Sequence, residues 1–395
     1  MNHPPGMTTI SAEDSFSPID NEPPLRWQRK LGLAPANGLG VMRRAMLLAG
    51  LAWLVPVIWA ALNHRLWEGA PGESLLQHFG IHARFLLAVV LLVIAEATVH
   101  KGLTRIVRQF IESGVIGAAT RAPFERVLQR MRRLRDITLP WVLLLGLVLA
   151  WTIADTPDAH TDALSWALDG NGQLGFGGWW VAYVSRPIFV ALLLAWLWRL
   201  LLVVILFARI GRLDLALVPT HPDRAGGLDF VQALPLSFAP VSLALSSAIS
   251  AHWAHDIVYH AVTLQALKLT AIAFVVISAF LWLLPLLMLA PALLAAKRQA
   301  RLAYAALVGE QGAHGAPALD TARTGGRPDA ARSRRDRLGR RYRSHLSRSG
   351  GHPPGADRPA RDGCNHAANS AADVAGRRAA NPIKDIVLEL LKALV

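Results

Sequence analysis

Six long blocks of apolar residues, separated by polar segments, dominate this sequence of 395 residues. A block of roughly 18 or more apolar residues is long enough to cross the hydrocarbon layer of a membrane, which is about 30 Å thick. Hydrophobic residues make up 53% of the chain, more than a water-soluble core of this size accommodates. The sequence therefore predicts an all-α, polytopic helical membrane protein with about six transmembrane helices. The blocks lie near residues 45–62, 82–100, 138–154, 180–207, 233–252 and 269–296.

Basic residues are concentrated in alternate loops between these blocks. Nine Lys and Arg residues lie between Lys101 and Asp136, whereas the loops 155–178 and 253–267 contain none. Positively charged loops remain in the cytoplasm, so the pattern predicts a multi-pass protein of a bacterial inner (plasma) membrane with a cytoplasmic N-terminus. Apolar residues at helical spacing within the basic segment, among them Phe124 and Leu128, predict a cytoplasmic basic helical hairpin. The expected partner is the lipid bilayer, with anionic headgroups at the cytoplasmic face, and no nucleic acid.

The chain outside the apolar blocks divides into three further parts. Residues 1–42, which carry several Pro, Gly and charged residues, predict a disordered cytoplasmic tail before the membrane core of residues 43–312. Residues 313–380 contain 14 Arg but no Lys, 6 Asp but no Glu, and no Ile, Met, Phe or Trp. Residues 381–395 predict an amphipathic C-terminal helix that begins at Pro382.

The composition of residues 313–380 has two explanations. The segment lacks the apolar side chains that offset the entropy of ordering, which is typical of a disordered, Arg-rich linker. The same bias is expected where a GC-rich gene is read out of frame, and we favour a pair of compensating frame changes. Much of the net charge of +14 lies in this segment, so that charge is weak support for a nucleic-acid partner.

The most distinctive motif, Pro-Thr-His-Pro-Asp-Arg-Ala-Gly-Gly-Leu at residues 219–228, follows the fourth apolar block. It is a candidate ligand loop, because charged and titratable groups lie beside glycines whose backbone amides could face an anion. The other interpretation is a rigid turn, in which the prolines fix the backbone and the glycines adopt positive φ. The candidate residues are His221, Asp223, Arg224, Gly226 and Gly227.

This motif resembles the PTHPDRxGGL phrase of a family of uncharacterised bacterial polytopic inner-membrane proteins. The resemblance runs from about Arg43 to Gly312 and returns at residues 383–395. It implies the polytopic fold but no activity, because none is established in that family. Its members carry one more apolar segment before the terminal helix, which agrees with a change of frame in this chain.

Charged residues inside the predicted spans form the second candidate site. An ionised side chain within the membrane needs a partner or water. Glu96 lies near the inner end of the second block, and Arg199 lies in the inner half of the fourth, so we expect an intramembrane pair. Arg186 lies near the outer interface, where its long side chain can reach the headgroups.

Four residues at the outer end of the fifth block are weak candidates for a metal site. His255, Asp256 and His260 follow His252 by three, four and eight residues, which places them on roughly one face of a helix. Imidazole and carboxylate groups can bind zinc or copper. Exposed histidines beside a membrane surface are the alternative, which we favour because no thiolate lies nearby.

Three classes of function remain open. A non-enzymatic envelope protein with a scaffolding or sensing role is favoured. A transporter or channel for a small solute or ion is the alternative, although we find neither internal repeats nor paired broken helices. A membrane-embedded enzyme is least favoured, because no nucleophile with its base, metal motif or nucleotide loop is recognisable. The sequence indicates no particular cofactor or oligomeric state.

Overall fold

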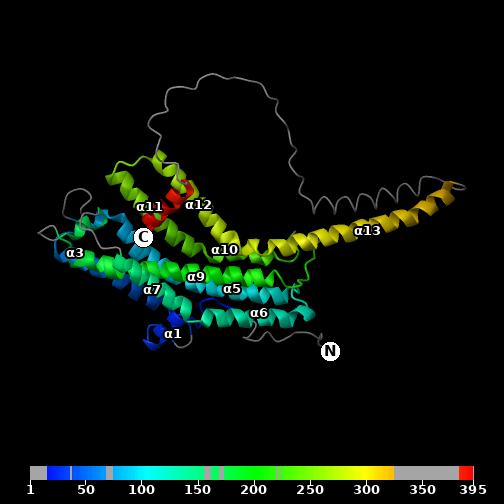
Figure 1. The fold of residues 1–395 in the computed structure, drawn as a ribbon, viewed down its shortest axis with the longest axis horizontal. Helices are drawn as coiled ribbons and strands as arrows, with labels where there is room; N and C mark the ends of the chain where they lie inside the picture. The colour runs from blue at the N-terminus through cyan, green and yellow to red at the C-terminus, as the bar shows by residue number, and fades with distance from the viewer. Residues whose placement is uncertain are drawn as a thin grey trace, which may run out of the picture. The chain divides into compact units, whose positions relative to one another are not determined.

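The computed structural model describes residues 16–35, 38–67, 74–154, 162–168, 173–218, 221–223, 225–323 and 382–394. In these ranges the chain is helical, and the only strand-like pairing is an isolated bridge between Leu168 and Leu174. Six helical stretches of the described chain are long and apolar enough to cross a membrane, which confirms the predicted all-α polytopic fold (Figure 1). They are Val41–Leu62, Phe79–Glu112, Ala118–Ala154, Phe176–Ile210, Asp229–Tyr259 and Leu264–Leu287.

The first, second and fourth of these stretches each contain a π-helical segment. The first joins α2 and α3 through a segment η2, and the second continues from α4 through η4 into α5. The fourth runs from α8 through η6 into α9. Their bounds are α2 (Val41–Ala49), η2 (Gly50–Leu54), α3 (Val55–Leu62), α4 (Phe79–Ile81), η4 (His82–Ala88), α5 (Val89–Glu112), α8 (Phe176–Trp180), η6 (Val181–Ser185) and α9 (Arg186–Ile210).

The remaining stretches are built from α6 (Ala118–Asp136) with α7 (Leu139–Ala154), from η7 (Asp229–Ala233) with α10 (Leu234–Ser237) and α11 (Ala239–Tyr259), and from α12 (Leu264–Leu287). The sixth apolar block was predicted to continue to residue 296, but α12 ends at Leu287 and α13 (Ala290–Arg323) begins after a short turn. Pro285 lies inside the last turn of α12, where proline removes a backbone donor and interrupts the helix.

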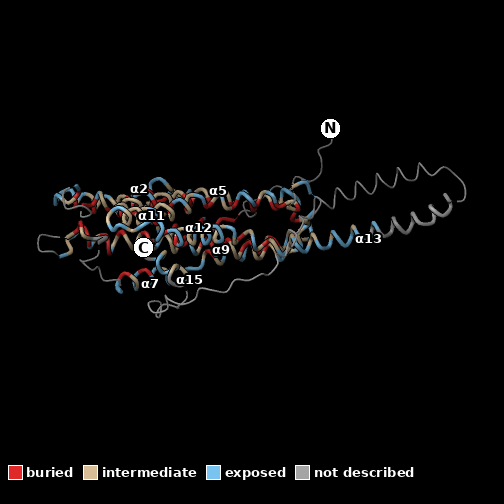
Figure 2. Tube along the Cα trace, turned by 90° about the horizontal axis from the view of Figure 1, so that it is seen from above, coloured by how far each residue is buried: buried red, intermediate tan, exposed pale blue. Residues whose placement is uncertain are grey.

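Burial is uneven among the spans. Buried residues gather along α5 and α9 (Figure 2), whereas most side chains of α7 and α12 are exposed or only partly buried. Leu143 of α7 and Val275 of α12 are each 64% exposed. Apolar side chains on such a surface are stable in lipid, because lipid tails are as apolar as the side chains themselves. The bundle therefore has an inner pair of helices, α5 and α9, and more peripheral helices that include α7 and α12.

The predicted basic hairpin is formed by the end of α5 and by α6. Gly114, with φ of +75°, reverses the chain after α5, and the left-handed conformation there suits glycine. Phe110 then contacts Phe124 of α6 and Phe207 of α9, with ring centroids 6.4 Å and 6.2 Å apart. Leu128 of α6 is fully buried as well. The hairpin is thus anchored by its apolar stripe.

The predicted disorder of residues 1–42 is wrong for the part that the structure describes. The helix α1 (Pro23–Lys30) forms there, and Phe16, Ile19 and Leu25 are at most 1% exposed. Arg135 Nη1 donates a hydrogen bond of 3.0 Å to the carbonyl oxygen of Ser17. Composition suggested disorder because this segment has few apolar residues, but those few are buried against other parts of the chain. Residues 1–15 lie outside the described ranges.

The chain divides into two compact units. One comprises Met1–Ala216, Phe230–Ala292 and Ile386–Val395, and the other comprises Leu217–Asp229 and Leu293–Asp385. Of the unusual segment 313–380, residues 313–323 belong to α13 and the rest lies outside the described ranges, so the out-of-frame hypothesis stays a prediction. The C-terminal helix α15 (Pro382–Leu394) begins at the predicted proline.

Candidate functional site

A cluster of four buried charged side chains joins the N-terminal segment to three transmembrane stretches. Glu22 precedes α1, Arg44 lies in α2, Glu96 in α5 and Arg199 in α9. Their side chains are at most 3% exposed. We call these four residues the charge cluster.

Glu96 and Arg199 connect the members of the charge cluster. Arg199 Nη2 donates to Glu96 Oε1 at 2.9 Å, and Arg199 Nε donates to Glu22 Oε2 at 3.1 Å. Arg44 Nη2 donates to Glu96 Oε1 at 3.2 Å, and a second contact joins each of the pairs Arg44–Glu96 and Arg199–Glu22. Two guanidinium groups thus face two carboxylates in a continuous chain of ion pairs.

Local structure places Glu22 at the start of α1. Its backbone amide donates to the carbonyl oxygen of Ile19 at 3.3 Å, which closes a turn. Pro23 then occupies the first position of the helix, where a missing amide hydrogen has no cost. The turn and the helix start together fix the point from which the Glu22 side chain reaches Arg199.

Further contacts support both arginines. Arg44 Nη1 also donates to the carbonyl oxygen of Leu39 at 3.3 Å. The Arg199 guanidinium carbon lies 5.0 Å from the centre of the Trp196 ring, a cation–π geometry. The indole nitrogen of Trp196 donates to the Leu92 carbonyl oxygen at 3.0 Å, which fixes the ring between α9 and α5. The cluster is therefore held by packing as well as by charge.

The charge cluster has no net charge when all four groups are ionised. A single buried charge is expensive, whereas paired and hydrogen-bonded charges offset most of their desolvation cost. Such a chain of ion pairs is suited to holding segments together, and among the described residues Arg44 Nε and Arg199 Nη1 are its buried nitrogens without a hydrogen-bond partner.

Sequence reasoning found half of this cluster. Glu96 and Arg199, the expected intramembrane pair, lie in direct contact. Arg44 was not predicted to take part in a site, and Glu22 lay in a predicted disordered tail. Two buried arginines with a single glutamate would imply a second acidic residue to balance the charge. Nothing in the sequence identifies Glu22 as that residue.

The PTHPDRAGGL loop is organised around the carboxylate of Asp223. Asp223 Oδ1 accepts from the amide of Ala225 at 2.9 Å, and Oδ2 accepts from the amides of Gly227 at 2.8 Å and Asp229 at 3.3 Å. His221 Nδ1 lies 2.9 Å from Oδ1. Partial desolvation raises the pKa of Asp223, but these backbone hydrogen bonds and His221 outweigh it and hold the pKa below its usual value.

These contacts favour a turn over an open anion site in this loop. Gly226 and Gly227 adopt positive φ of 70° and 92°, as the motif predicted. The amide of Gly227, which could have faced an external anion, already donates to Asp223. The Asp223 carboxylate therefore occupies the position that an external anion would take. Pro219, Thr220 and Arg224 lie outside the described residues.

The four candidate metal ligands do not converge. His252 Nε2 lies 3.6 Å from Asp256 Oδ2, while the His255 ring stacks on His78 with centroids 5.0 Å apart. The His260 ring meets the edge of His255 at 5.5 Å. Among the described residues no three His, Cys, Asp or Glu side chains are arranged to hold a metal ion. His255 is held by this aromatic packing and by a contact of 3.3 Å between its Nδ1 and the Gln77 carbonyl oxygen.

The π-helical segment η2 lies against both of the others, η4 and η6. Ser185 Oγ donates to the carbonyl oxygen of Ala52 at 2.7 Å, and the Trp180 indole donates to that of Leu51 at 2.9 Å. The Trp53 indole donates to His82 Nδ1 at 2.9 Å. A π-helical segment changes the hydrogen-bond pattern of the α-helical backbone. Side chains of a neighbouring helix here donate hydrogen bonds to carbonyl oxygens of η2. Sequence patterns gave no sign of these segments.

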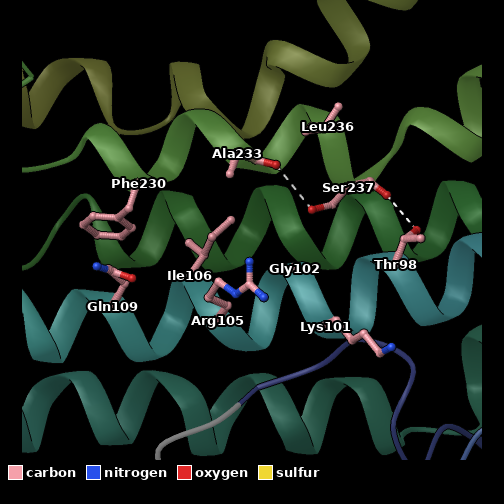
Figure 3. A pocket seen from close by; sticks show the side chains of 10 residues that line it. All are labelled: Thr98, Lys101, Gly102, Arg105, Ile106, Gln109, Phe230, Ala233, Leu236 and Ser237. Atoms are coloured by element: carbon pink, nitrogen blue, oxygen red, sulfur yellow. Dashed lines mark hydrogen bonds between the residues drawn. The ribbon is translucent and has the colours of Figure 1, made fainter.

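A pocket of about 370 Å³ lies between α5 and the segment formed by η7 and α10 (Figure 3). Its floor is a close contact, because a Cβ atom at Gly102 would lie 2.0 Å from Ser237 Oγ. Thr98 Oγ1 donates to the Ser237 carbonyl oxygen at 3.0 Å, and Ser237 Oγ donates to that of Ala233 at 3.3 Å. The remaining walls carry both apolar and basic side chains. No sequence signal pointed to this pocket.

The fold and these sites define the class as a polytopic α-helical membrane protein. No known family matches the chain, and neither a curated protein nor a solved structure is significantly similar to it. Function is therefore inferred from the geometry of the chain itself.

Proposed function

We propose that this chain is a non-enzymatic protein of a bacterial inner membrane, with a scaffolding or sensing role at the cytoplasmic face. The observation that carries the proposal is the ion pair between Glu22 of the N-terminal segment and Arg199 of α9. It connects a segment outside the spans to α9, one of the two inner helices of the bundle. A scaffold or sensor needs such a connection between a peripheral segment and its membrane helices.

Charge balance makes the connection strong. If the N-terminal segment leaves, Arg44 and Arg199 remain buried with Glu96 as their only acidic partner in the cluster. An uncompensated buried charge destabilises a protein by several kcal/mol, on the order of 3–5. The position of residues 16–30 and the packing of α2, α5 and α9 are therefore coupled. A stimulus that binds or displaces the segment would change the packing of the spans.

The orientation in this proposal follows from charge. The basic hairpin of α5 and α6 and the N-terminal segment contact one another, since Arg26 Nη2 donates to the Asp136 carbonyl oxygen at 3.2 Å. Basic segments remain on the cytoplasmic side, so both are assigned there. Anionic lipid headgroups at that face would be the partner of the exposed arginines of the hairpin.

The family resemblance supports the same class. We keep it as a proposal that the chain belongs with the uncharacterised inner-membrane proteins that carry the PTHPDRxGGL phrase. The positive φ angles of Gly226 and Gly227 give a physical reason for two glycines in the phrase. The resemblance supplies no activity, so the functional argument depends on the charge cluster.

The coupling is tested by the variant Glu22→Gln, with Asp20→Asn as the matched control. Asp20 lies two residues away, is 55% exposed, and pairs with Arg29 only at 3.8 Å. In native membranes, limited trypsin should cleave Glu22→Gln faster after Arg26, Arg29 or Lys30, and the purified variant should lose thermal stability. Asp20→Asn should behave as the unchanged protein. Equal cleavage in all three proteins would contradict the docking of the segment.

A transporter or channel is the second candidate, and the contacts of η2 with η4 and with η6 favour it. Irregular helical geometry inside a bundle is frequent at functional sites. If these segments form a pathway, protein reconstituted in liposomes should pass protons or monovalent cations, and Ser185→Ala should change the rate. Flux equal to that of empty liposomes would leave the scaffold or sensor as the better proposal.

A further inference from the structure

The pocket between α5 and α10 combines an apolar wall with a guanidinium group. Leu236 on α10 is 76% exposed, and Ile106 and Phe230 also line the pocket. The Phe230 ring is fixed by Phe110, with ring centroids 5.0 Å apart at nearly a right angle. A ligand of the pocket therefore meets a rigid aromatic side chain and an exposed leucine.

Two basic residues of α5, Lys101 and Arg105, line the pocket, and the charged group that faces it is that of Arg105. Figure 3 shows its guanidinium group turned from α5 toward the pocket, with Gln109 one turn further along the same helix. Within the described part of the chain Arg105 has no acidic partner. The next arginine, Arg108, by contrast donates from Nε to Glu112 at 2.8 Å. Arg105 is thus a cation beside a pocket and available to an external anion.

The pocket lies where α5 changes from apolar to polar. The apolar stretch of α5 ends at Val99, and His100 and Lys101 follow. Thr98 marks the apolar end of the pocket and Gln109 the polar end. Such a boundary lies at the level of lipid headgroups, where basic residues meet phosphate and apolar residues meet acyl chains. The polar atoms of Thr98 and Ser237 are already hydrogen-bonded to backbone carbonyl oxygens.

We propose that this pocket binds one anionic phospholipid, whose phosphate contacts Arg105 and whose glycerol and first acyl carbons lie against Leu236 and Phe230. The planar guanidinium matches the geometry of a phosphate oxygen pair. Gln109 can donate a further hydrogen bond through its amide. The site is distinct from the charge cluster, and neither proposal depends on the other.

Native mass spectrometry of the detergent-solubilised protein, titrated with phosphatidylglycerol, tests the site. Arg105→Gln should weaken binding of the first lipid by about tenfold, because it removes a charge-assisted hydrogen bond. Arg108→Gln removes the same charge from the same helix outside the pocket, and should leave the first binding step within about twofold of the unchanged protein. Phosphatidylcholine, which has no net charge, should bind more weakly than phosphatidylglycerol.

Three results would overturn the proposal. Equal losses for the two arginine variants would mean diffuse attraction to the basic hairpin. Equal binding of phosphatidylcholine and phosphatidylglycerol would remove the anionic requirement, and displacement of the lipid by millimolar inorganic phosphate would indicate a site for free phosphate. If Arg105→Gln does not fold, Arg105→Lys replaces it. That variant keeps the charge but loses the planar pair of donors, so unchanged binding would also count against the proposal.

Discussion

The charge cluster and the Asp223 loop are both built around carboxylates, but different groups offset the desolvation cost of those carboxylates in the two places. In the charge cluster, guanidinium groups come from helices that are far apart in sequence, Arg44 and Glu96 being 52 residues apart and Glu22 and Arg199 being 177 apart. In the loop, the partners of Asp223 lie at most 6 residues away and are mainly backbone amides. The first arrangement fixes the tertiary structure, whereas the second fixes one turn.

The comparison predicts a difference in the cost of disruption. Loss of a member of the charge cluster leaves a buried charge and weakens the contacts among several segments. Loss of Asp223 frees a few amides near the surface of one loop, where water can replace part of the bonding. Variants of the charge cluster should therefore lower the stability of the whole chain, whereas variants of Asp223 should mainly change the local order of one loop.

The largest effect is expected for Glu96→Ala, which leaves Arg44 and Arg199 with Glu22 alone. The free energy of unfolding should fall by roughly 3–5 kcal/mol, and folded yield should fall strongly. The yield is measured by fluorescence-detected size-exclusion chromatography of a tagged protein, with the stability taken from thermal unfolding.

A second substitution should reveal how the cluster is connected. Adding Arg44→Ala to Glu96→Ala leaves the Glu22–Arg199 pair intact, so part of the yield should return. Adding Arg199→Ala instead removes the shared partner of both acids, and should restore less. Equal recovery in the two double variants would show that the arginines are interchangeable and that the chain of ion pairs is wrong.

A region was predictable from the sequence where its contacts are local, and less so where they join residues far apart in the chain. Span positions were predictable because each apolar block is continuous, and the turn at Gly226 and Gly227 was predictable because its geometry depends on neighbouring residues. The Glu96–Arg199 pair could be proposed because both residues are conspicuous inside apolar blocks. Glu22 could not, since its role depends on the packing of a segment in which Phe16 and Ile19 are buried and Ser17 accepts a hydrogen bond from Arg135, 118 residues away.

Asp223→Asn should have the next largest effect. The amide side chain keeps one oxygen acceptor and presents an NH₂ group to backbone donors, so at least one of the three amide hydrogen bonds is lost. Local stability should fall by about 1–3 kcal/mol. Hydrogen exchange should accelerate at the amides of Gly227 and Asp229, while folded yield changes little. A loss of yield as large as that of Glu96→Ala would show that the loop stabilises the whole chain.

Gly226→Ala should cost less, about 1–2 kcal/mol, because an L-residue is strained at φ of +70°. The added Cβ would also lie 3.1 Å from Leu293 Cδ1, a flexible side-chain end that can shift. Gly117→Ala is the control, because a Cβ there meets nothing within 4 Å and its φ is −72°. Thermal unfolding of the two variants should differ in this order. A control as unstable as Gly226→Ala would remove the conformational explanation.

The smallest effect is the pH dependence of the loop, and it sharpens the contrast between the two regions. The pKa of Asp223 is lowered in the folded chain, because backbone amides and His221 outweigh the opposing effect of desolvation. A carboxyl group with a lowered folded pKa stabilises the structure fully above its unfolded pKa, about 4, and this contribution is lost as the pH falls through the folded value. Protection of the Gly227 amide, corrected for intrinsic exchange, should therefore be constant near neutrality and decrease below about pH 4. Asp223→Asn has no carboxyl group to titrate, so its protection should be lower throughout and independent of pH in this window. If the unchanged protein loses protection at the same rate as the Asn variant, or only where the whole chain unfolds, the carboxylate is not what holds the turn.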